Sequence, residues 1–129
     1  MRSLSTLCLG GASQVKNLEP LRHLTGLRRL QIESLLGVRD ASPLGSLTGT
    51  THLALGGNWM TPRRAHIESL DWLPRLRNVR HLLLHTLAVE DLDYTPLLRL
   101  ERLEAVGVMR VQGMRPSFEE LKHRLPWAE

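Results

Sequence analysis

The chain has 129 residues and a formal charge of +4; 42% of its residues are hydrophobic and 23% are charged. This composition excludes disordered and fibrous proteins, and no run approaches the ~18 apolar residues of a membrane span, so a soluble, cytoplasmic protein is predicted. Leucine supplies 28 residues, whereas Phe, Tyr and Ile together supply four, which indicates one packing arrangement used many times.

A repeat of 23 residues begins near the amino terminus. The segment 4–9 (LSTLCL) aligns with 27–32 (LRRLQI) at this offset, which also carries Pro20 onto Pro43. Three further copies of the motif lie at 50–55, 79–84 and 103–108. In each copy the fourth and sixth residues are expected to point into the core, and the strands to pair in parallel.

The strand motif LxxLxL, followed by a proline-leucine return as in 40–49 (DASPLGSLTG), resembles the short bacterial repeats of internalin-like leucine-rich repeat proteins. The resemblance covers nearly the whole chain. It implies an α/β fold: a leucine-rich repeat solenoid of about five units with a parallel inner sheet, short helical returns and a C-terminal capping helix. Only Asn58 matches the asparagine that follows the strand in this family, so the turns are expected to be irregular. The other four copies carry Ala12, Leu35, Leu87 and Val111 there.

The third unit has 29 residues, whereas the first two have 23 and the fourth has 24. Thr61 and Pro62 have the pattern of a helix start, and Ile67, Leu70 and Leu73 recur at helical spacing. A helix of two to three turns is therefore predicted in this insert.

The two ends of the repeat array differ. Segment 117–125 opens with a Ser-x-x-Glu capping box and is followed by Pro126, which predicts a capping helix. No such element precedes Leu4, so the first strand would have an exposed edge. We therefore expect residues 1–129 to be a single domain that forms the C-terminal part of a longer chain, or two copies to form a homodimer through this edge.

The third and fifth positions of each motif point outward on the inner sheet. They form one column of Thr6, Arg29, His52, His81 and Ala105, and another of Cys8, Gln31, Ala54, Leu83 and Gly107. His52 and His81 are expected about 5 Å apart, with His85 beyond them on the same strand. The predicted partner-binding residues are Arg29, Gln31, His52, His81, Leu83 and His85 on this face, with Trp59 and Trp72 beside the insert.

These residues favour a protein–protein interaction module that binds a protein ligand on its concave face. The alternative is a regulatory module that binds metal through the three histidines, or nucleic acid through the arginines. The histidine spacing matches no known metal signature, and no aromatic residues alternate with the arginines, so neither a metal nor a nucleic-acid partner is expected. Cys8 has no assignable base, so no enzyme and no cofactor are predicted. The family resemblance implies a bacterial protein, and the bare first strand suits the C-terminal sensor of a NACHT/STAND-type signalling NTPase.

Overall fold

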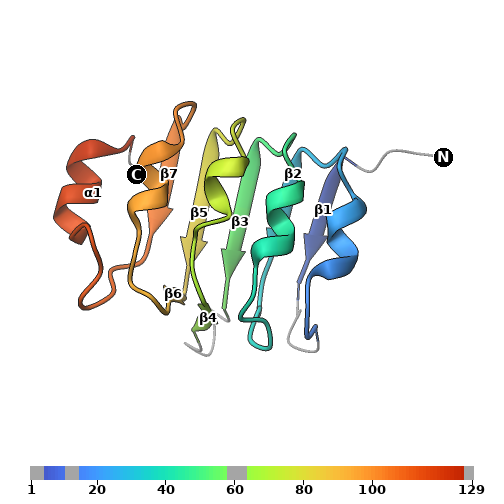
Figure 1. Ribbon diagram of the computed structural model, residues 1–129, viewed down its shortest axis with the longest axis horizontal. Helices are drawn as coiled ribbons and strands as arrows, with labels where there is room; N and C mark the ends of the chain where they lie inside the picture. Colours follow the sequence, from blue (N-terminus) through green and yellow to red (C-terminus); the bar gives the residue numbers. More distant parts are fainter. Residues whose placement is uncertain (1–4, 11–14, 58–63, 127–129) are drawn as a thin grey trace.

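The repeated leucines form one five-stranded parallel sheet. In the computed structural model, which describes residues 5–10, 15–57 and 64–126, its strands lie in the order β1, β2, β3, β5, β7 (Figure 1). Their bounds are β1 Thr6–Leu9, β2 Arg29–Ile32, β3 His52–Gly56, β5 His81–His85 and β7 Ala105–Val108. The predicted leucine-rich repeat solenoid is confirmed.

Backbone hydrogen bonds hold successive units in the register of the repeat. The amides of Arg28 and Arg29 both donate to the carbonyl of Ser5, at 2.8 and 3.0 Å. The same paired bond is repeated at the start of each later strand, on the carbonyls of Arg28, Thr51 and Arg80. Residues one repeat apart are therefore placed side by side, and the motif leucines stack into a single core.

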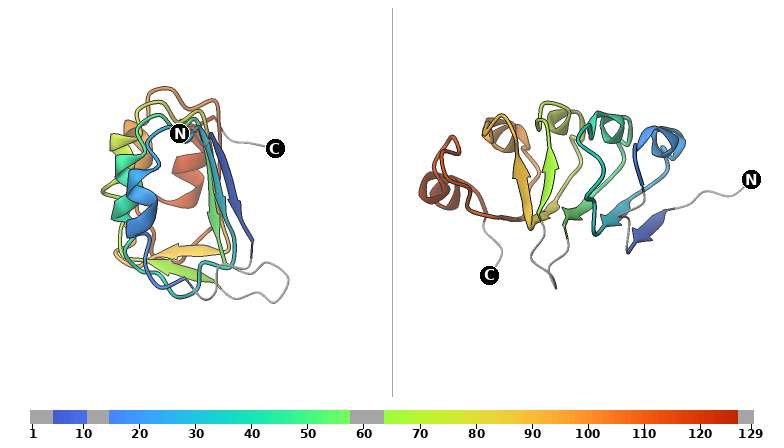
Figure 2. Two further views of the ribbon diagram at one scale, coloured as in Figure 1. Left: turned by 90° about the vertical axis from the view of Figure 1, so that its right-hand side faces the viewer. Right: turned by 90° about the horizontal axis from the view of Figure 1, so that it is seen from below.

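Short 3₁₀ turns return the chain on the convex side of the sheet (Figure 2). They are η2 Glu19–His23, η3 Ser42–Ser46, η4 Leu73–Arg75 and η5 Thr95–Arg99. Each has a proline at its first or second position. At or just before each turn, a polar side chain accepts a hydrogen bond from the backbone amide two residues further along the chain, as Asp40 does from Ser42 at 3.0 Å. The predicted short helical returns are confirmed. They are 3₁₀ turns because the buried leucines recur every three residues, the period of that helix.

The prediction of a helix in the insert is wrong for the part that the structure describes. Thr61 and Pro62 lie outside the described residues. Strand β4 (Ala65–Ile67) forms there instead and pairs in parallel with β6 (Leu87–Val89). Ala65 and Ile67 are buried and His66 is exposed, which is the alternation of a strand. The apolar spacing that resembled a helix arises from this strand followed by a turn.

The insert joins the repeat at a shared hydrogen-bond acceptor. The amides of Gly57 and Ala65 both donate to the carbonyl of Thr86, at 3.1 and 2.8 Å. The chain thus leaves the repeat at Gly57 and rejoins it at Ala65 without shifting the neighbouring unit.

Two aromatic residues replace aliphatic ones under the returns of the longer units. Tyr94 is 1% exposed, and its hydroxyl accepts a hydrogen bond from the amide of Val89 at 3.2 Å. Burial raises the pKa of the Tyr94 hydroxyl. Trp72 is 3% exposed, and its indole N–H donates to the carbonyl of Ser69 at 2.9 Å. Both are core residues whose polar atoms are satisfied.

The predicted C-terminal capping helix is confirmed, and the first described strand lies at the opposite edge of the sheet. At the carboxyl end, α1 (Phe118–Arg124) begins at Ser117, whose hydroxyl accepts from the amide of Glu120 at 3.2 Å, and the amide of Val106 in β7 donates to the carbonyl of Pro126 at 2.9 Å. At the other end, β1 is an edge strand with half-buried leucines, whereas their counterparts in β2 are fully buried.

We expect Tyr94→Phe to lower the free energy of unfolding by about 2 kcal/mol, because it leaves the buried amide of Val89 without an acceptor. Urea unfolding measures the change. Thr25→Val removes an exposed hydroxyl instead and should leave stability within about 0.5 kcal/mol of the wild type. A Tyr94→Phe chain as stable as the wild type would contradict the role assigned to this bond.

Candidate concave interface

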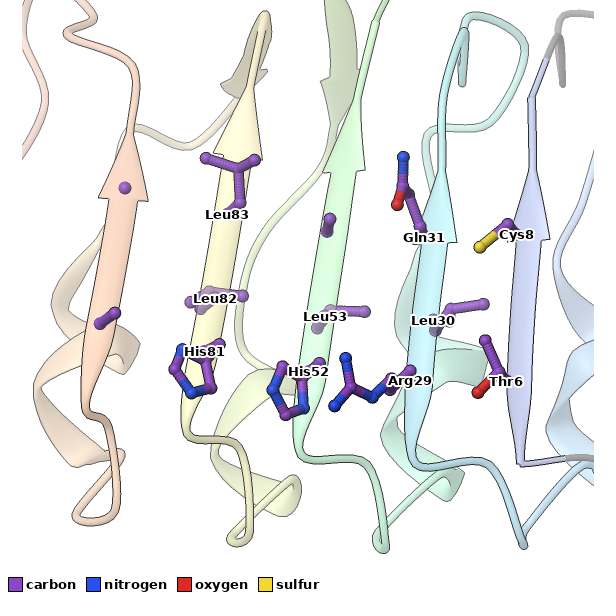
Figure 3. Close-up of a pocket in the computed structure, with 13 residues that line it drawn as sticks. Thr6, Cys8, Arg29, Leu30, Gln31, His52, Leu53, His81, Leu82 and Leu83 are labelled. Carbon is purple, nitrogen blue, oxygen red and sulfur yellow. The ribbon is translucent and has the colours of Figure 1, made fainter. Parts of the chain in front are cut away.

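The inner surface of the sheet, which we call the concave face, consists of the two outward columns of side chains. Strand pairing places Thr6, Arg29, His52, His81 and Ala105 in one row, and Cys8, Gln31, Ala54, Leu83 and Gly107 in the next. Both rows have the composition expected from the sequence. Together they line a shallow hollow of about 470 Å³ (Figure 3).

Planar polar groups meet in the first row. The rings of His52 and His81 stack with their centroids 4.4 Å apart and an interplanar angle of 15°. The guanidinium end of Arg29 points toward His52 from the adjacent strand (Figure 3). Arg29 makes no ion pair with any described residue. Its charge is therefore available to a ligand.

Thr51 sets the tautomer of His52. The Thr51 hydroxyl donates its one proton to the carbonyl of Arg28 at 3.1 Å, and its oxygen lies 2.9 Å from Nδ1 of His52. Nδ1 must then be the donor in that contact, which leaves Nε2 of the neutral ring as an acceptor. Burial lowers the pKa of His52, as do the charges of Arg29, His81 and Arg80, while Glu104 opposes them. These surroundings favour the neutral ring over the charged one.

The other ring of the stack is next to a carboxylate. Nε2 of His81 lies 3.8 Å from Glu104, which also pairs with Arg80 at 3.4 Å. The stacked pair therefore lies between two unlike surroundings, with a cation on the His52 side and a carboxylate on the His81 side. The sequence reasoning did not select Thr51 or Glu104. Like Arg28 and Arg80, they occupy the second position of the motif, directly before the outward column. Their place in the motif could have indicated that they lie beside the histidines.

A single large apolar side chain stands in the second row. Leu83 is 46% exposed, and its neighbours across the strands are Ala54 and Gly107. A side chain at Gly107 would come within 3.1 Å of Leu83. Because Ala54 and Gly107 are small, the Leu83 side chain extends beyond its neighbours into the hollow.

His85 does not join the histidine pair. It lies at the far end of β5, opposite Gly56, and a Cβ on Gly56 would come within 2.3 Å of its ring. No group of three potential metal ligands occurs among residues 5–10, 15–57 and 64–126. The metal alternative, which needs three imidazoles together, is not supported.

The remaining predicted residues divide between the face and the core. Gln31 lies on the face and donates to Glu33 at 2.6 Å, whereas Trp72 is buried and cannot contact a partner. The proposed interface role of Trp72 is wrong, because its ring fills the longer unit. Trp59 lies outside the described residues.

The fold places this chain among solved leucine-rich repeat structures. An internalin (inlF) from Listeria monocytogenes matches with a TM-score of 0.65 and 26% identity, over 81% of this chain and 28% of that one. Internalin C2 (inlC2) of the same species matches with a TM-score of 0.59 and 19% identity, over 93% of this chain and 48% of that one. This chain thus spans less than half the length of either protein. No family model and no curated protein matches its sequence.

These similarities define the class of the molecule. The chain has the leucine-rich repeat fold, and folds of this internalin-like kind generally mediate protein–protein interaction. In the described part of the chain, no helix has both the length and the apolar character needed to cross a membrane.

We expect His52 to make stability depend on pH. Its pKa is lower in the folded chain than the ordinary value of 6.5, so the unfolded chain binds the proton first as the pH falls. The contribution of His52 is therefore fully present above about pH 6.5 and is lost as the pH falls through its folded pKa. Urea unfolding at about pH 7.5 and about pH 5.5 should show a smaller loss for His52→Gln than for the wild type. His23→Gln, at an exposed position on η2, should retain the wild-type loss. Equal losses in His52→Gln and the wild type would contradict this role.

Proposed function

We propose that the concave face binds a protein ligand. The observation that carries this proposal is Leu83, a large apolar side chain that is exposed in the hollow between the small residues Ala54 and Gly107. Exposed apolar groups that can enter a partner's pocket contribute much of the energy of protein interfaces. Strand β5, which carries Leu83, is hydrogen-bonded to a strand on each side, so little conformational entropy is lost on binding.

In this proposal the polar side chains of the concave face fix the orientation of the ligand. Arg29 offers a guanidinium that has no ion-pair partner among the described residues, His52 offers Nε2, and Gln31 offers its amide oxygen beside the apolar surface around Leu83. A ligand that combines a carboxylate with an apolar side chain would satisfy both rows at once. His81 borders this area, and His85 lies at its end.

We propose further that the domain works without catalytic chemistry, in the cytoplasm of a bacterium, as the ligand-recognition part of a longer signalling protein. Similarity to bacterial repeat proteins supports the bacterial setting. The single free cysteine, Cys8, is in keeping with a reducing compartment. The sensor of a NACHT/STAND-type NTPase is the specific form of this proposal.

The test places a photo-crosslinking amino acid at position 83 in cells that express the protein, and at position 99, in η5 on the convex side, as the control. We expect a partner that crosslinks from position 83 and not from position 99. The purified partner should bind Leu83→Glu at least about tenfold more weakly than the wild type, whereas Arg99→Glu should bind normally. Leu83 is largely exposed, so this change should not unfold the domain. Equal crosslinking from both positions, or full affinity of Leu83→Glu, would overturn the proposal.

We also propose that the edge of β1 is covered in the functional protein, by preceding residues or by a second copy of the chain. Its leucines are half-buried and, among the described strands, it pairs with β2 alone. Such an edge is a template for another strand.

Sedimentation across a range of concentration tests this edge in the 129-residue chain. We expect concentration-dependent self-association, most simply as a two-fold dimer in which the two β1 edges meet antiparallel. We expect Ser5→Lys to weaken it, because like charges would then meet across the two-fold axis. Ser42→Lys, on the convex side, should behave as the wild type. A wild-type chain that is monomeric at every concentration would contradict self-association.

A further inference from the structure

A second hollow lies outside the concave face, along the edge of the sheet where the strands begin. It has a volume of about 720 Å³, and we call it the amino-end groove. Three arginines border it: Arg28, Arg80 and Arg102. Its remaining lining residues are serine, threonine, glycine and asparagine, so it contains neither an aromatic ring nor a carboxylate.

Two glycines leave this groove open. Gly26 and Gly49 occupy the repeat position that Asn78 and Arg102 occupy in later units. Gly49 does not have a positive φ, and a Cβ added there would meet its nearest atoms at 3.7 Å, an ordinary van der Waals distance. Neither backbone conformation nor packing therefore requires glycine at position 49. What its missing side chain provides is space between Arg28 and Arg80.

The charges around the groove are held in place and only partly neutralised. Arg102 donates to Asn78 at 2.8 Å, and Asn78 in turn donates to the carbonyl of Thr48 at 3.1 Å. Arg80 pairs with Glu104 at 3.4 Å. Arg28 makes no ion pair within the ranges 5–10, 15–57 and 64–126. The groove therefore has an excess of positive charge.

The backbone amides at the strand starts are already used within the sheet. The amides of Arg28, Thr51 and Arg80 donate to the carbonyls of Ser5, Arg28 and Thr51 at 2.8, 2.7 and 2.8 Å. At these positions a ligand of the groove meets the side chains of Arg28 and Arg80. Arg28 and Arg80 precede strands two positions apart in the sheet, which separates their backbones by about 10 Å. An extended ligand that carries several negative charges can pair with both guanidinium groups at once.

We propose that the amino-end groove binds an acidic segment of a polypeptide. Guanidinium groups bind carboxylates through paired hydrogen bonds, and the serine, threonine and asparagine side chains of the lining can hydrogen-bond a polypeptide backbone. Nucleic acid is the less favoured ligand, because no aromatic ring lines the groove for bases to stack on. The proposal does not depend on what the concave face binds.

The test titrates the ¹⁵N-labelled 129-residue chain with a short polyglutamate peptide, with polyglutamine of the same length and with an oligothymidylate. We expect polyglutamate to shift the signals of Gly49, Thr51 and Arg80 and the side-chain signal of Arg28, and polyglutamine to leave them unchanged. Raising the salt concentration from about 50 to about 200 mM should weaken the binding. No shift with polyglutamate, or tighter binding of oligothymidylate, would overturn the proposal.

Variants separate the groove from the overall charge of the protein. Gly49→Glu puts a carboxylate in the groove and should weaken polyglutamate binding about tenfold. Gly49→Gln fills the same space without a charge, so a comparison of the two variants separates the effect of the added charge from the effect of the lost space. Arg99→Gln changes the net charge equally on the convex side and should bind as the wild type. Arg28→Gln, at an exposed position, should weaken binding even if Gly49→Glu proves unstable. Equal weakening by Arg99→Gln and Gly49→Glu would show that net charge alone attracts the peptide and would refute the groove.

Discussion

The whole architecture depends on the paired backbone bonds at the start of each strand. One carbonyl, such as that of Ser5 or Arg28, accepts two amides from the next unit and so fixes that unit at the same register. A single unit is one strand and one turn and cannot bury its own leucines. Once units are held in register, each leucine packs on its counterpart in the next unit, and the core becomes continuous. The same bonds align the outward residues, so the sheet that makes the core also determines which side chains meet on the concave face.

The sequence predicts the features that repeat and misses those that depend on one particular neighbour. The strands, the 3₁₀ returns and the capping helix follow from local patterns of leucine, proline and Ser-x-x-Glu. The insert is different, because Ile67, Leu70 and Leu73 suit a helix as well as a strand followed by a turn. Only the pairing of β4 with β6 decides between them, and that contact joins segments about twenty residues apart. The hydroxyl of Tyr94 as acceptor for Val89 likewise depends on packing that no periodicity shows.

At the candidate site, position was predictable and orientation was not. The alternation of strand residues places His52 beside His81 and Leu83 between Ala54 and Gly107. The direction of Arg29 toward His52, and the hydrogen bond that the Thr51 hydroxyl accepts from Nδ1 of His52, depend on side-chain rotamers. The orientation of His85 was likewise not predictable from the sequence. It shares the outward face of β5 with His81, yet its ring lies against Gly56, away from the pair. The stacked imidazoles thus lie between a cation, Arg29, next to His52 and a carboxylate, Glu104, next to His81.

The shared acceptor at Thr86 has a consequence for how this protein can vary. Because the amides of Gly57 and Ala65 are both held by one carbonyl, the two ends of the segment between them are fixed next to each other. That segment can be replaced, lengthened or diversified while the sheet and the stacked returns keep their register. The segment between Gly57 and Ala65 is therefore a suitable grafting point. New recognition sequences can be acquired there by evolution, or introduced by engineering, on a scaffold that stays unchanged.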